Sequence, residues 1–292
     1  MGLFGGGYTK EGPGVDKDAP KKRGIFLYAE LFVRKFWKII QSNLLYSMVS
    51  LPMLVLMFCT SFFMIMPAME GTITAIAETV GYNTGELAVH FSIIFAFGMT
   101  TLWGSGPASA GLAYILRCFA REEHAWIWSD FKDKFKSNLK QSAVVIIVDL
   151  AVLFLVINAV YFYSAQFRST GNTMWFVMTY IILLLFVLYT FMHFYIYQIM
   201  VTFECTIVQL YRNALIFAFA KLPMNLLLTA FILAVLLGLS SFLPQAAVVV
   251  LYLAVGINFS VFPTAFYASR SLQRVLESTL ENKPNNAEKE TD

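Results

Sequence analysis

Long apolar segments alternate with short polar ones along most of the chain, and this alternation is the first feature to explain. An apolar stretch of about 18 or more residues with few charges is typical of a helix that crosses a bilayer. The pattern therefore predicts an all-α membrane protein with six transmembrane helices. They are expected at residues 43–66, 91–116, 143–164, 174–203, 222–243 and 245–268.

Composition agrees with this pattern. The chain has 292 residues, of which 58% are hydrophobic and 13% are charged, whereas soluble domains carry roughly a quarter charged residues. The first apolar run has no clear cleavage site behind it, so we expect it to stay in the mature protein. The polar ends, residues 1–24 and 279–292, are expected to be disordered cytoplasmic tails around a membrane domain of residues 25–278.

The basic residues predict the orientation. Of the 21 lysines and arginines, all but Arg168 fall in segments that six spans would place on one side of the membrane. Basic residues mark the cytoplasmic side of membrane proteins. We therefore expect both termini in the cytoplasm, with the spans forming three hairpins of the same orientation. The segment 67–90 contains acidic but no basic residues and is expected outside.

Between the second and third spans lies the polar sequence WSDFKDKFKSNLKQS, residues 128–142. On a helix, its apolar side chains form one stripe and its lysines another. Such a basic amphipathic helix is typical of the membrane interface. The alternative, a solvated loop, would leave the aromatic side chains exposed. The interfacial helix is expected to contain Trp128, Phe131, Lys132, Phe135, Lys136, Leu139 and Lys140.

Two other segments resemble this one weakly. Aligning Asn43 and Asn213 with Asn138 suggests three units, each a cytoplasmic amphipathic helix followed by a transmembrane hairpin. Many secondary transporters contain inverted repeats, which would alternate in orientation. The repeated orientation expected here counts against a carrier.

The second predicted span contains a candidate helix break at Gly104, Gly106 and Pro107. Proline removes a backbone donor, and glycine lowers the cost of leaving the helix. The break has two interpretations. It is either a hinge beside a polar cavity or a kink at which small residues let helices approach closely.

Asp149 lies about seven residues inside the third predicted span, and His193 about ten residues inside the fourth. At a rise of 1.5 Å per residue these depths are roughly 10 and 15 Å, close enough for a pair. An acidic group at such depth should face protein or water. With Gln198 and Asn258, the pair defines a candidate polar cavity open to the cytoplasm. The alternative is a set of hydrogen bonds between helices.

The motifs of common catalytic and metal sites are not found. The sequence has no HExxH, no CxxC, no GxSxG and no Walker A motif, so no cofactor, metal or catalytic activity is expected. The basic residues are dispersed and the net charge is only +3. We therefore expect the lipid bilayer, and no nucleic acid, as a partner.

Residues 105–142 resemble the YesL family of bacterial integral membrane proteins. The resemblance is carried by five features: Gly106-Pro107-Ala108, Ala110-Gly111-Leu112, the arginines Arg117 and Arg121, the segment from Trp128 to Phe131, and Asn138 to Gln141. The acidic segment 67–90 is longer than in the family. A location in the bacterial plasma membrane is what this resemblance implies.

The YesL family has no established biochemical activity, and its members are often encoded beside carbohydrate-uptake transporters. The resemblance thus implies a non-enzymatic accessory or assembly protein that contacts subunits of a carbohydrate ABC transporter. In this interpretation the interfacial helices form the docking surface. The alternative is a small-molecule transporter that uses the cavity around Asp149 and His193. The sequence does not indicate the oligomeric state.

Overall fold

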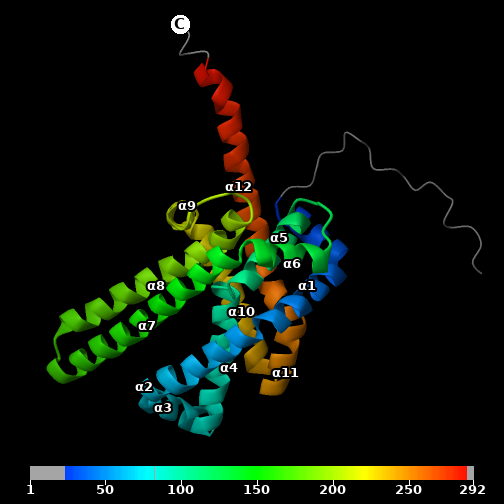
Figure 1. The fold of residues 1–292 in the computed structure, drawn as a ribbon. Helices are drawn as coiled ribbons and strands as arrows, with labels where there is room; N and C mark the ends of the chain where they lie inside the picture. The colour runs from blue at the N-terminus through cyan, green and yellow to red at the C-terminus, as the bar shows by residue number, and fades with distance from the viewer. Residues whose placement is uncertain (1–23, 82, 288–292) are drawn as a thin grey trace, which may run out of the picture.

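The computed structural model describes residues 24–81 and 83–287, which form helices and no strands (Figure 1). Within these ranges, six helices are long and apolar enough to cross a membrane, as predicted. They are α1 (Ile25–Thr60) with the π-helical turn η1 (Ser61–Ile65), α4 (Thr84–Leu102), α7 (Leu139–Thr170), α8 (Thr173–Met200), α10 (Leu222–Phe242), and α11 (Gln245–Leu251) with the π-helical turn η2 (Tyr252–Gly256) and α12 (Ile257–Ala287).

Five shorter helices connect these elements. The acidic segment after η1 forms α2 and α3, α5 continues the second span beyond a break, and α6 and α9 each precede a long helix. Their bounds are Met66–Ala68 for α2, Glu70–Val80 for α3, Pro107–Ala120 for α5, Ile127–Ser137 for α6 and Ile207–Ala220 for α9.

Contacts between helix ends place three arginines at one end of the molecule. Arg34 on α1 forms an ion pair of 2.7 Å with Glu122, which follows α5. Arg117 on α5 donates to the carbonyl of Val201 after α8 at 3.1 Å. Arg270 on α12 donates to the carbonyl of Ala120 at 3.4 Å. We call the end of the molecule marked by these contacts the basic end.

The α7–α8 hairpin departs from the other helices and projects from the body (Figure 1). Its two parts differ sharply in burial. Every residue of α8 from Thr190 to Met200 is buried, whereas no side chain from residue 154 to residue 189 is. The hairpin is thus fixed to the body at its inner end and exposed over its outer part.

Polar side chains join α1 to the last long helix. Asn43 donates to the carbonyl of Leu253 at 2.6 Å and accepts from the backbone amide of Asn258 at 2.7 Å. Leu253 lies in η2, and Ser47 donates to the same carbonyl at 2.9 Å. Asn258 donates in turn to Ser42 at 2.8 Å. Widening of the helix at a π-helical turn changes its backbone hydrogen bonding, and α1 supplies donors to the Leu253 carbonyl there.

Several predicted boundaries differ from the structure. The segment before the first span is not a separate amphipathic helix but the start of α1. The alignment of three units also fails, because Asn138 lies between two helices while Asn43 and Asn213 lie inside α1 and α9. Residues 279–287, which were expected to belong to the disordered tail, instead continue α12 as far as Ala287. Residues 1–23 and 288–292 of the predicted tails lie outside the described residues.

Candidate functional site

The second span is broken at the predicted position. Helix α4 ends at Leu102 and α5 begins at Pro107, with Gly104 at φ 86° and Gly106 at φ 60°. Glycine adopts positive φ without the steric cost that other residues incur. Pro107 occupies the first turn of α5, where a missing amide hydrogen costs nothing. The sequence therefore ends one helix and starts the next within four residues.

Side chains from three helices surround the break, and two of them accept hydrogen bonds from its backbone amides. The amide of Ser105 donates to the hydroxyl of Ser109 at 2.7 Å, and the amide of Gly106 donates to Tyr197 on α8 at 3.1 Å. The hydroxyl of Tyr46 on α1 lies 3.0 Å from Ser105 and 3.1 Å from Ser109. Non-helical backbone is tolerated inside a membrane protein only where such partners surround it.

Asp149 and His193 form a direct contact beside the break. The Nε2 atom of His193 lies 2.9 Å from Oδ1 of Asp149, and the exposed fractions of the two side chains are 0% and 2%. The same oxygen accepts a hydrogen bond of 2.7 Å from Tyr189, one turn before His193 on α8. The contact between Asp149 and His193, inferred from their similar depths in neighbouring spans, is thus present in the structure.

Both ring nitrogens of His193 have partners inside the protein. Its Nδ1 atom is 3.1 Å from the carbonyl oxygen of Tyr189, and its Nε2 atom faces Asp149. Both side chains of the pair are almost fully buried. The polar atoms of the pair are therefore turned toward each other and toward Tyr189 rather than toward a solute.

Trp103 links the pair to the break. Its ring stacks on His193 with a centroid distance of 5.2 Å and an interplanar angle of 11°. Its indole nitrogen donates to Thr190 at 2.9 Å. Because Trp103 directly follows α4, the path of the chain through the break sets the position of this ring. The two sites predicted separately are therefore one cluster.

The cluster extends toward the basic end through a second tyrosine. The hydroxyls of Tyr189 and Tyr211 on α9 lie 3.5 Å apart. Burial raises the pKa of Tyr211 to about 12, so its hydroxyl stays protonated at neutral pH. Tyr211 therefore connects to the buried cluster as a neutral hydrogen-bonding group.

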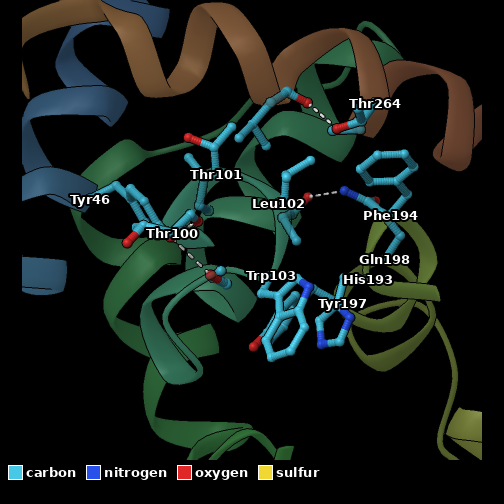
Figure 2. A pocket seen from close by; sticks show the side chains of 16 residues that line it. Tyr46, Thr100, Thr101, Leu102, Trp103, His193, Phe194, Tyr197, Gln198 and Thr264 are labelled. Carbon is cyan, nitrogen blue, oxygen red and sulfur yellow. Dashed lines mark hydrogen bonds between the residues drawn. The ribbon is translucent and has the colours of Figure 1, made fainter. Parts of the chain in front are cut away.

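A cavity of about 50 Å³ lies on the other side of His193 (Figure 2). Among the described residues, the side-chain oxygens of Thr100 and Gln198 are buried at its wall without a hydrogen-bond partner. A cavity of this size with such polar atoms suits a few water molecules. Small-molecule sites are usually 300–1,000 Å³, so this cavity is too small for a sugar.

The predicted cavity residues are only partly brought together. His193 and Gln198 line the cavity, whereas Asp149 lies behind His193 and does not. Asn258 lies at the α1–α12 contact, where it donates to Ser42. Asn258 is not among the residues that line this cavity, because its side chain faces α1.

Helix α6 also differs from the predicted interfacial helix. It ends at Ser137, so Leu139 belongs to α7, and Trp128 is 69% exposed. Phe131 is buried against α5, where a Cβ added to Gly111 would lie only 2.9 Å from its ring. Helix α5, rather than lipid, covers the centre of the apolar stripe. Phe135 is partly buried, while Lys132, Lys136 and Lys140 are exposed.

Sequence reasoning missed the aromatic members of the cluster, Trp103, Tyr189 and Tyr197. One available signal was helical spacing, because Tyr189, His193 and Tyr197 recur every four residues and therefore share one face of α8. In a chain with 28 phenylalanines and 14 tyrosines, this spacing does not stand out from ordinary apolar packing.

Comparisons with known proteins give one partial match to a family model and no activity. A family model described as "Protein of unknown function, DUF624" matches residues 88–159. The matched range contains the helix break, α5, α6 and Asp149. Neither a curated protein nor a solved structure matches the chain. Over the part that forms the break and half of the buried pair, the chain is thus similar to a family of unknown function.

Proposed function

We propose that this chain is a non-enzymatic accessory or assembly subunit of a carbohydrate ABC-type uptake system in a bacterial plasma membrane. Its basic end would face the cytoplasm, as the distribution of lysines and arginines predicts. The family resemblance supports the carbohydrate assignment. The observation that carries the proposal is the α7–α8 hairpin, which has no buried side chain from residue 154 to residue 189.

The hairpin suits a role in helix docking. Two helices that leave the body expose both of their outer faces, so another membrane protein can contact them without displacing any helix of this chain (Figure 1). Asn158 is exposed midway along α7, and among the described residues its amide nitrogen donates to the carbonyl of Phe154 in its own helix, at 2.7 Å. Hydrogen bonds between helices contribute to association in membranes. The carboxamide oxygen of Asn158 can accept such a bond.

The transporter alternative has less support. A transport site must bind its solute and open to both sides of the membrane in turn. The cavity at His193 has a volume of about 50 Å³, and Asp149 and His193 are bonded to each other. The packed centre therefore favours a subunit over a carrier.

Photocrosslinking tests the docking proposal. A photoreactive amino acid at Leu184 on the hairpin should give a discrete adduct with a transmembrane subunit of the uptake system in native membranes. A matched control is Val250 on α11, because the two side chains are similarly exposed, at 70% and 64%. Asn158→Leu should lower the adduct yield about threefold, the effect of one average hydrogen bond between membrane helices. Equal adducts from both positions, or lipid adducts alone, would contradict the proposal.

Cysteine labelling tests the orientation. With Cys59, Cys118 and Cys205 replaced by alanine, a membrane-impermeant maleimide on intact cells should label Thr170→Cys and not Ser137→Cys. Both should react after permeabilisation, because both positions are exposed. Retaining Cys205 would add little signal, since burial raises the pKa of its thiol and the thiolate is the reactive form. The reverse labelling pattern would show that the basic end faces outward.

A further inference from the structure

A second cavity, of about 760 Å³, lies between α1, α10 and α12 near the basic end. It is separate from the cluster at the helix break and shares no lining residue with the smaller cavity. Its volume falls within the range of small-molecule sites. The cavity can therefore take a ligand that the first cannot.

The walls of this cavity change from apolar to charged along α12. Phe231 and Pro263 lie at one end, and Arg270, Arg274 and Glu277 at the other. From Pro263 to Arg274 the helix rises roughly 16 Å at 1.5 Å per residue. The apolar part lies toward the middle of the spans and the charged part toward the basic end. An amphiphile whose head lies at the basic end has the matching polarity.

The arginines indicate the charge of the head group. Arg270 packs over the Phe266 ring at 5.5 Å and donates to Ala120, but among the described residues its buried Nε atom has no acceptor. Arg274 is exposed at the same end. Glu277, the one acidic residue among the described residues of the lining, accepts from Gln273 at 2.9 Å. Over the described lining residues, two arginines and one glutamate give a net charge of +1. A phosphate oxygen would supply an acceptor for Arg270.

We propose that this cavity binds one phospholipid with an anionic head group from the leaflet at the basic end. The phosphate lies between Arg270 and Arg274, and the part of the acyl chains next to the head group lies against Phe231 and Pro263. Basic pockets between transmembrane helices are known to recognise anionic lipids in this way. The proposal does not depend on the docking role of the hairpin.

Native mass spectrometry of the purified full-length protein tests the proposal. Phosphatidylglycerol and phosphatidylcholine with identical acyl chains are titrated separately, and a single adduct selective for phosphatidylglycerol is expected. Arg274→Gln should weaken phosphatidylglycerol binding about fivefold, the effect of one basic residue near an anionic surface. The control Arg212→Gln, an exposed arginine outside the cavity, should leave binding unchanged. Leu227→Trp, which fills the cavity from its α10 wall, should weaken binding of both lipids.

Three outcomes would overturn the proposal. Equal losses of phosphatidylglycerol affinity in Arg274→Gln and Arg212→Gln would show general attraction to a basic surface rather than binding at a site. Unchanged binding in Leu227→Trp would place the lipid outside the cavity. Binding of soluble glycerol phosphate as tight as that of phosphatidylglycerol would show that the arginines take a free phosphate ester.

Discussion

Asp149→Ala is expected to lower the free energy of unfolding by about 3–5 kcal/mol, the usual loss when one partner of a buried charged pair is removed. The substitution leaves the Nε2 atom of His193 and the hydroxyl of Tyr189 without their acceptor in the interior. It also frees α7 from its polar contact with α8. The melting temperature in detergent, followed by tryptophan fluorescence, measures the loss.

Two variants serve as controls for Asp149→Ala. Asp149→Asn keeps an oxygen that can accept from Tyr189, so this variant should lose clearly less free energy of unfolding than Asp149→Ala. Phe154→Ala changes an exposed side chain about one turn further along α7 and should shift stability by no more than about 0.5 kcal/mol, as is usual for surface positions. If Asp149→Ala were no more harmful than Phe154→Ala, the cluster would not hold the hairpin to the body.

Gly106→Ala is expected to destabilise the protein for two additive reasons. Gly106 has φ 60° and ψ −118°, a sparsely populated conformation of the kind that costs about 1–3 kcal/mol. An added Cβ would also lie closer than van der Waals contact to the side chain of Ile146 on α7. Overpacking of this kind costs typically about 1–3 kcal/mol. Thermal unfolding in detergent should therefore show that Gly106→Ala lowers the free energy of unfolding by several kcal/mol.

Gly24→Ala is the matched control for Gly106→Ala. Gly24 precedes α1 as Gly106 precedes α5 and has a similar backbone conformation, φ 63° and ψ −134°, but no neighbouring atom lies within 4 Å of an added Cβ. The stability lost in Gly24→Ala therefore measures the backbone contribution alone. In a double-mutant cycle, Ile146→Ala should recover the steric part of the Gly106→Ala loss. Equal losses in the two glycine variants would show that the break is not tightly packed against α7.

The sequence predicted the helices well because hydropathy depends on composition over long windows. It also predicted the break, since Gly104, Gly106 and Pro107 act through local backbone preferences. The Asp149–His193 contact could be inferred because antiparallel neighbours place equal depths side by side. Each of these inferences needs only position along a helix.

Rotation of a helix about its axis was not predictable in the same way. Asn258 faces α1, and Phe131 faces α5 instead of lipid. An apolar stripe looks the same in sequence whether a bilayer or another helix covers it. The stacking of Trp103 on His193 depends on tertiary packing across the break, which leaves no periodic signal.

The place of the Asp149–His193 contact has a mechanical consequence. The contact joins α7 to α8 where the hairpin enters the body, and no side chain from residue 154 to residue 189 is buried. A lateral force on the tip of the hairpin therefore acts as a torque about its inner end, and the buried segment of α8 from Thr190 to Met200 bears that torque.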